Sequence, residues 1–152
     1  MPASRWPHVV DALLTALDAD AALTGKVYDS VPVTAEAITD GVFIGVVLDD
    51  DNGDAGKVTQ DWHELGGLPP RDETGAIRCT VMAQRGDTDL ATARTSAFDH
   101  FAAVESVCRT DYDLAVADVQ WLHVTAGRIR QGQTPRGSYC EIEFTVTYQA
   151  LI

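Results

Sequence analysis

The closing part of the chain, from Tyr139 to Tyr148, alternates strictly between two kinds of side chain. Successive side chains of a strand point to opposite faces of a sheet, so this period of two predicts a strand with one face in the core. The inward set is expected to be Cys140, Ile142, Phe144, Val146 and Tyr148, and the outward set Glu141, Glu143, Thr145 and Thr147. The outward face is therefore expected to be solvated or to meet a partner.

Two other segments have the spacing of amphipathic helices. Apolar residues recur at steps of three and four near the start of the chain, which predicts a helix over about residues 8–23. Pro7 suits its first turn, and Gly25 suits the position after its end. A second, longer helix is expected to begin at Asp87 or Thr88, either of which can cap it. Its apolar face is predicted to consist of Leu90, Ala97, Phe98, Phe101, Val104 and Cys108.

Further strands are expected at residues 27–31, 42–48, 58–65, 76–83 and 115–124. The second of these is apolar on both faces, which is typical of a central strand. Ala126-Gly127 is expected to be a turn, followed by a short strand or an extended loop over residues 128–132. The connections Asp49–Gly56 and Gly66–Gly75 are long for a small domain, and such loops are often functional.

The order of these segments is helix, strands, helix, strands. This order favours an α+β fold with a largely antiparallel sheet of about four to six strands and two amphipathic helices on one face. A length of 152 residues suits one domain, and we find neither an internal repeat nor a second domain, so residues 1–152 are expected to form a single unit.

The chain is strongly acidic, with 23 acidic and 11 basic residues and a net charge of −12. Nine of these excess charges lie between Met1 and Leu65, where twelve acidic residues face three basic ones. Such a balance argues against a broad basic surface that grips nucleic acid, and against docking on an anionic membrane. No stretch has the apolar length of a membrane helix, and the N-terminus does not have the pattern of a secretory signal.

The cysteines and the acidic cluster were tested as metal sites. Cys79, Cys108 and Cys140 are far apart, which favours three reduced, buried thiols over a disulfide framework or a zinc site. The cluster Asp49–Asp54 fails the spacing of an EF-hand, because the first and twelfth ligand positions would be Leu48 and Thr59. A solvated turn is favoured there, and a divalent-cation site of another geometry stays open.

No motif indicates catalysis. The chain has no GxSxG, Walker or GxGxxG motif, and His63 has no second histidine at the spacing of a zinc protease. Cys140 could pair with His100 or His123, but its inward position favours packing. His100, one residue before Phe101, is expected on the flank of the second helix. We therefore expect no enzyme activity and no cofactor.

The pattern as a whole resembles the tail terminator (tail completion) proteins of long-tailed, non-contractile phages, the family that includes the lambda minor tail protein U. It looks most like versions from phages of actinobacteria. Four features carry the resemblance: the opening helix that ends in Leu23-Thr24-Gly25 and runs into 27–34, the strand from Asp40 to Val46, the stretch 71–79 followed by Gly86–Asp89 and a helix with Ala93-Arg94, and the closing strand 137–146. The resemblance covers nearly the whole chain, and the order and spacing of these features carry it.

The resemblance implies a structural protein of the virion, located at the head–tail junction and assembled in the host cytoplasm. Such proteins form a ring, typically a hexamer, on the head-proximal end of the tail tube. The ring ends tube polymerisation and offers a docking surface to the head connector. Its implied partners are copies of itself, the tail tube protein and the head–tail connector or head-closure protein. The genomic DNA passes through the ring without specific binding.

Two groups of residues become candidates for this role. Carboxylates that line a channel would repel the DNA backbone, so we expect Asp49, Asp50, Asp51 and Asp54 to face the channel or its rim. A solvated loop on the outside of the ring is equally consistent with these four residues. Ring closure needs contacts between two different surfaces of neighbouring subunits. The residues expected at contacts with subunits, tube or connector are Arg71, Asp72, Glu73, Arg128, Arg130, Arg136, Glu141 and Glu143. The two glutamates could meet arginines of a neighbour, or could pair within the chain.

Three other functions are left open. A head-closure or neck protein is also a small ring-forming virion component. A tail tube subunit fits less well, because tube proteins devote more of the chain to sheet. The third is a small cytosolic enzyme, or a metal-binding domain that uses Asp49–Asp54.

Overall fold

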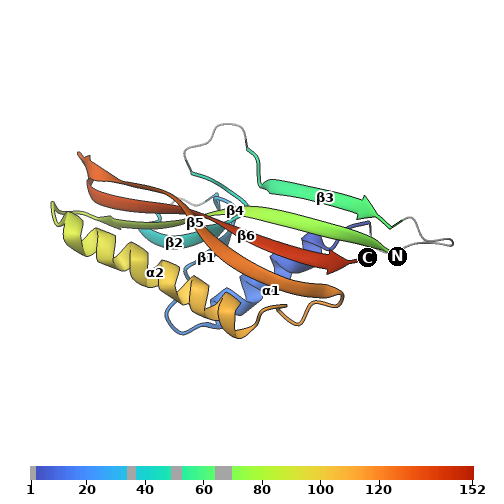
Figure 1. The fold of residues 1–152 in the computed structure, drawn as a ribbon. Coiled ribbons are helices and arrows are strands. Elements are labelled where there is room, and N and C mark those ends of the chain that lie inside the picture. The colour runs from blue at the N-terminus through green and yellow to red at the C-terminus, as the bar shows by residue number, and fades with distance from the viewer. Residues whose placement is uncertain (1–2, 34–36, 49–52, 64–69) are drawn as a thin grey trace.

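The computed structural model describes residues 3–33, 37–48, 53–63 and 70–152. A single twisted sheet forms one layer, and two helices form a second layer on one side of it (Figure 1). The elements are α1 (Trp6–Ala19), β1 (Val27–Asp29), β2 (Asp40–Ile44), β3 (Gly56–Trp62), β4 (Arg71–Arg85), α2 (Leu90–Thr110), β5 (Val119–Thr134) and β6 (Gly137–Leu151). Neither helix is long and apolar enough to cross a membrane, in the part of the chain that the structure describes.

The sheet has six strands in the order β1-β2-β4-β6-β5, with β3 paired to β4 as well. Strands β2 and β3 follow each other along the same edge of β4, whose residues 79–83 pair with β2 and 71–77 with β3. The pair β1–β2 is parallel, and the other pairs are antiparallel. The α+β fold with a mostly antiparallel sheet and two helices on one face is therefore confirmed.

The alternation in the last strand is confirmed residue by residue. The five side chains predicted to face inward are at most 2 % exposed, and Ala150 continues the pattern. The same holds for the inward side of β4, where Ile77, Cys79, Val81 and Ala83 are fully buried. Because β4 and β6 lie side by side over fourteen residue pairs, their inward faces form one apolar floor on which α2 packs.

The first helix is shorter than predicted and ends at Ala19. Asp20 leaves the helical conformation, with ψ of 130°, and its carboxylate accepts a hydrogen bond from the Ala22 N–H at 2.9 Å. Aspartate side chains compete in this way for backbone donors and end helices. Leu23 is still fully buried, because the following turn folds it back into the core, and this burial explains why the apolar spacing ran past the helix.

The second helix begins after Asp89, not after Asp87 or Thr88. The Asp89 carboxylate accepts from the Thr92 N–H at 3.0 Å, while Asp87 accepts from the N–H of Asp89 and shapes the turn before the cap. The capping residue type was predicted correctly and its position was not. Both aspartates suit a cap chemically, and only the path of the chain from β4 selects one.

Two side chains of α2 differ from the prediction in their burial. Phe98 is 41 % exposed, and His100 is only 7 % exposed. At about 100° per residue, the buried residues Ala93, Ala97, His100, Phe101, Val104 and Cys108 span an arc of about 100°, and Phe98 lies about 60° beyond it. Phe98 was predicted to be in the core because it is apolar. The stripe of α2 that contacts the sheet is narrower than the predicted apolar face, and Phe98 lies outside it.

Several strand limits are also corrected. Residues 71–75 belong to β4 and not to a loop, because they pair with both β3 and β6. Strand β5 runs without a break from Val119 to Thr134, and the turn expected at Ala126-Gly127 is a bulge that sets one extra residue of β5 against β6. The strand predicted at 42–48 is β2 and ends at Ile44, where Gly45 takes a φ of +77°. Strand β3 starts two residues earlier than predicted and ends at Trp62.

Candidate functional site: the open face of the sheet

The side of the sheet away from the helices is named here the open face. It carries the outward side chains of β4, β5 and β6, which register pairs such as Arg130 with Glu141 and Met82 with Glu141 place together. Its charged side chains on these three strands are the carboxylates Asp72, Glu141 and Glu143 and the guanidinium groups Arg78, Arg128 and Arg130. Three negative and three positive charges give this face no net charge, in a chain whose net charge is −12.

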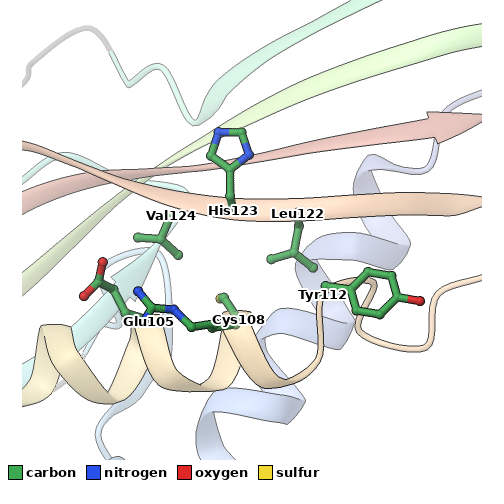
Figure 2. A pocket seen from close by; sticks show the side chains of 7 residues that line it. Glu105, Cys108, Tyr112, Leu122, His123 and Val124 are labelled. Atoms are coloured by element: carbon green, nitrogen blue, oxygen red, sulfur yellow. The ribbon is translucent and has the colours of Figure 1, made fainter.

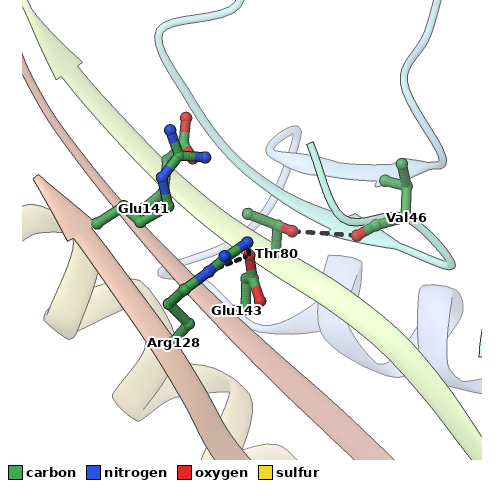
Figure 3. A network of polar contacts seen from close by, with 6 residues as sticks. Val46, Thr80, Arg128, Glu141 and Glu143 are labelled. Atoms are coloured by element: carbon green, nitrogen blue, oxygen red, sulfur yellow. Dashed lines mark hydrogen bonds and ion pairs between the residues drawn. The ribbon is translucent and has the colours of Figure 1, made fainter. Parts of the chain in front are cut away.

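The arginine–glutamate contacts predicted for this face occur within one chain. The Nη2 atom of Arg128 lies 2.6 Å from the Oε1 of Glu143, and the Nη1 of Arg130 lies 3.6 Å from the Oε2 of Glu141 (Figure 3). The bulge in β5 brings Arg128 beside Glu143, while Arg130 stands directly opposite Glu141. Of the two alternatives left open for these glutamates, pairing within the chain is the one observed here. Surface pairs of this kind contribute about 1 kcal/mol or less to stability.

Part of the open face is covered by the segment that follows β2. The Thr80 hydroxyl donates a hydrogen bond to the Val46 carbonyl oxygen at 3.0 Å, and Thr80 is only 1 % exposed (Figure 3). The backbone N–H of Arg78 donates to the Ala55 carbonyl oxygen at 2.8 Å, which continues the β3–β4 ladder beyond the Gly56–Ile77 pair. The accessible part of the open face is therefore its β5–β6 side.

Glu73 was expected at a contact surface, but the structure places it inside the chain with no exposed area. Its Oε1 accepts from the Tyr148 hydroxyl at 2.7 Å and from the Arg5 N–H at 2.8 Å, and its Oε2 accepts from the Gln60 amide at 2.7 Å. Burial raises the pKa of this carboxyl, but the hydrogen bonds from Tyr148, Gln60 and Arg5 outweigh it and lower the pKa overall. Burial and the nearby carboxylate raise the pKa of Tyr148. The hydrogen bonds of Glu73 thus link the N-terminal segment and β3 to Tyr148 in the core.

One signal in the sequence could have located this cluster. Tyr148 was placed on the inward face by the alternation, and a buried tyrosine hydroxyl usually finds a hydrogen-bond partner. The acceptor lies 75 residues away in the chain, so no local pattern distinguishes Glu73 from other carboxylates as the partner.

The other predicted contact residues lie at separate places. Arg71 stacks over the Trp62 ring, 4.8 Å from its centroid, and donates to the Ala3 carbonyl oxygen at 3.1 Å. The Oδ2 of Asp72 lies 2.8 Å from the Nε2 of His63. Arg136 is exposed in the two-residue turn between β5 and β6. These residues do not form one cluster with the Arg128–Glu143 pair.

The predicted acidic cluster is described only in part. Asp54 is exposed, just before β3. Asp49, Asp50 and Asp51 lie outside the described residues. The expectation that all four face a channel therefore stays a hypothesis.

A small pocket of about 250 Å³ opens between α2 and the edge strand β5 (Figure 2). Its lining residues are Glu105, Cys108, Arg109, Tyr112, Leu122, His123 and Val124. Leu122 and Val124 point from β5 toward α2, whereas the His123 ring points to the other side of the strand (Figure 2). Burial raises the pKa of the Cys108 thiol to about 12, so the thiol stays protonated and is not an activated nucleophile.

The remaining titratable groups do not assemble into a reaction centre. All three cysteines are buried and free, as predicted, and burial also raises the pKa of Cys79 to about 12. The Nε2 of His100 faces the Oδ1 of Asp40 at 3.8 Å, and burial lowers the pKa of His100 despite that carboxylate. Within residues 3–33, 37–48, 53–63 and 70–152, no three His, Cys, Asp or Glu side chains gather in a group that could hold a metal ion.

Comparison with known proteins is informative at the level of solved structures. No protein-family model and no curated protein sequence matches the chain. Among solved structures, the chain is similar to a chain from the virion of a native gene transfer agent (GTA) particle, with a TM-score of 0.63 and 16 % sequence identity. The match covers 99 % of this chain and 100 % of that chain. At this identity the likeness shows a shared fold over the full length.

Proposed function

We propose that this chain is a structural protein of a phage-like virion, and specifically that it caps the head-proximal end of a tail tube as a ring. The observation that carries the proposal is the full-length likeness to a chain of a gene transfer agent virion, with both chains covered end to end. The order of sequence features that resembles tail terminators supports the same role. The activity is capping and docking, without bond chemistry.

The charge distribution supports assembly through the open face. Copies of a chain with net charge −12 repel one another, and surfaces of like charge cannot be pressed together without cost. The open face has no net charge and presents alternating Arg and Glu side chains on β5 and β6. A neutral polar face of this kind can meet a neighbouring virion protein without that repulsion, so we assign to it the contact with the tube or the connector.

The acidic residues fit a conduit for DNA. A lumen that carried positive charge would hold the phosphate backbone, whereas carboxylates leave DNA free to pass. In the proposed ring Asp54 and the neighbouring Asp49, Asp50 and Asp51 line the channel or its rim. A ring structure with these four residues on its outer circumference would contradict this placement.

The test is genetic. Removal of the gene from the virus or particle that carries it is expected to give tails of uncontrolled length that fail to join heads, as seen by electron microscopy. Supplying the wild-type chain in trans is expected to restore normal tails. Tails of normal length would refute the terminator role. Normal tails that do not join heads would instead indicate a head-closure protein.

A further inference from the structure

A row of apolar side chains lies along the outer edge of β5, beside α2, with Glu105 and Arg109 also lining its pocket end. The pocket of about 250 Å³ forms one end, with Cys108, Leu122 and Val124 on its walls and Tyr112, which is 60 % exposed, at its mouth. Phe98 and Ile129 extend it along the same edge. We name these six residues the α2–β5 groove.

The placement of Phe98 and Ile129 follows from their neighbours. The Arg94 Nε donates to the Gln131 side-chain oxygen at 2.8 Å, which ties the first turns of α2 to the far part of β5. Phe98 lies one turn after Arg94 and two turns before Glu105, a pocket residue, on the same side of the helix. Ile129 is paired with the buried Ile142, so its side chain belongs to the helix side of the sheet, yet it is 49 % exposed.

The groove lies beside a strand edge that is open beyond Leu122, whose backbone N–H donates to the Tyr112 carbonyl oxygen at 2.6 Å. In the sheet order β5 is the last strand, paired with β6 alone among the described strands. An edge strand next to a helix, with an apolar pocket between them, is the geometry that accepts an extended segment by strand addition. Backbone hydrogen bonds hold such a segment, and alternate side chains enter the groove. The occupant must therefore be extended and carry apolar side chains two residues apart.

The chain itself carries apolar side chains at this spacing at the opposite edge of the sheet, after a bend at Ser30 and Val31. Val31 and Val33 follow β1 and are 54 % and 106 % exposed, and Val33 is the most exposed large apolar residue described. Their spacing of two places both side chains on one face of an extended segment. Pro32 between them has no N–H, which a strand tolerates when that position faces away from the ladder, so Val31 and Val33 remain able to bond β5.

Charge favours the same pairing. Strand β5 contains Arg128 and Arg130 and no carboxylate over its sixteen residues. The stretch from Asp29 to Asp40 contains three carboxylates and no basic residue. The contact would thus bring an acidic stretch to the least acidic strand edge.

We propose that the Val31–Val33 segment of one copy adds to β5 of a second copy and places its valines in the α2–β5 groove. The donor and acceptor lie at opposite edges of the sheet, β1 and β5, so the contact is head to tail and repeats from copy to copy. It names the subunit contact of the ring and therefore rests on the proposed function.

The first test is a substitution at the donor. Val33→Asp is expected to weaken self-association at least tenfold, measured by sedimentation velocity over a range of concentrations, with no change in the unfolding curve because Val33 is fully exposed. Thr59→Asp, an exposed position of β3 that pairs with the exposed Thr74, adds the same charge outside both surfaces and is expected to leave association within twofold of wild type. Equal association of Val33→Asp and wild type would overturn the inference and leave the ring intact.

The second test introduces two exposed thiols, one in each surface. Val33→Cys combined with Ile129→Cys, a groove residue that is 49 % exposed, is expected to form disulfides between neighbouring copies under a copper–phenanthroline oxidant, which gives a ladder of linked chains on a non-reducing gel. Each single variant is expected to lack the ladder, because one introduced thiol links at most two chains. A double variant without a ladder, or a ladder in either single variant, would overturn the inference. A chain that stays monomeric at every concentration and does not bind tail tubes would overturn the inference and the proposed function together.

Discussion

Replacement of Glu73 by glutamine tests the buried cluster that joins the N-terminal segment, β3 and β6. The variant keeps the shape of the side chain and removes its charge. The Glu73 Oε1 accepts two hydrogen bonds, from Tyr148 and Arg5, and a glutamine oxygen can still accept both. The Oε2, however, accepts from the Gln60 amide, and a glutamine N–H₂ would face that donor with a donor of its own.

The size of the effect follows from this geometry. A hydrogen bond to a charged group contributes about 1.5–3 kcal/mol, and a neutral one about 1 kcal/mol. One charged bond is lost and two become neutral, so the free energy of unfolding is expected to fall by about 2.5–7 kcal/mol at neutral pH. Rotation of Gln60 to offer its oxygen does not rescue the variant, because the same amide nitrogen also donates to the Ala3 carbonyl oxygen at 2.8 Å.

The pH dependence gives a second readout. The folded state lowers the pKa of Glu73 from 4.5, so the carboxylate stabilises the fold fully above the unfolded value, and this contribution is lost as the pH falls through the folded pKa. The difference between wild type and Glu73→Gln is therefore expected to be largest at pH 7 and to narrow below about pH 4.5. Urea denaturation followed by far-ultraviolet circular dichroism at several pH values measures both quantities.

A matched control is Glu143→Gln, which removes a carboxylate from the surface pair with Arg128 and is expected to cost less than about 1 kcal/mol. A loss below 1 kcal/mol for Glu73→Gln at pH 7 would refute the account of the cluster. So would a loss that does not change between pH 7 and acid pH.

Three further predictions concern the core. A Cβ at Gly75 would overlap the Tyr148 ring, so Gly75→Ala is expected to lower the free energy of unfolding by about 2 kcal/mol or more in urea denaturation, whereas Gly86→Ala, with open space around it, should change it by less than about 0.5 kcal/mol. Burial lowers the pKa of His100 from 6.5, so the unfolded state binds a proton at a higher pH than the folded state does, and the melting temperature is expected to fall as the pH drops below about 6.5. His100→Gln is expected to weaken this dependence of the melting temperature on pH. An unchanged dependence would contradict the attribution to His100. The three buried thiols are expected to react with a thiol reagent at the rate of unfolding, and fast labelling of the native protein would show that a thiol is accessible.

The corrected position of Phe98 connects the fold with assembly. On residue type alone a phenylalanine in an amphipathic helix belongs in the core, but here it lies at the edge of α2 with 41 % of its area exposed. An exposed apolar side chain is informative when others join it, and Tyr112 and Ile129 are exposed along the same edge. Phe98, which is not in the core as predicted, is thus part of the α2–β5 groove, for which we propose a partner.

The sequence by itself determined the features that depend on local period. The alternation over Tyr139–Tyr148 and over Ala76–Ala83 placed the inward sides of β6 and β4, and the helical spacing located α1 and α2. The charge balance, from composition alone, excluded a broad basic surface. These predictions succeeded because the period of apolar side chains reflects which face of one element is buried, whatever its neighbours are.

Only the tertiary structure decided which elements meet. The burial of Glu73 against Tyr148, the pairing of Arg128 with Glu143 and the open groove along β5 all depend on strand order and register. The limits of the strands also depend on which strands are neighbours. Residues 71–75 belong to β4 because they pair with β3 on one side and β6 on the other. Contacts between residues far apart in the chain are fixed by the topology that buries the most apolar surface, and no local pattern contains that information.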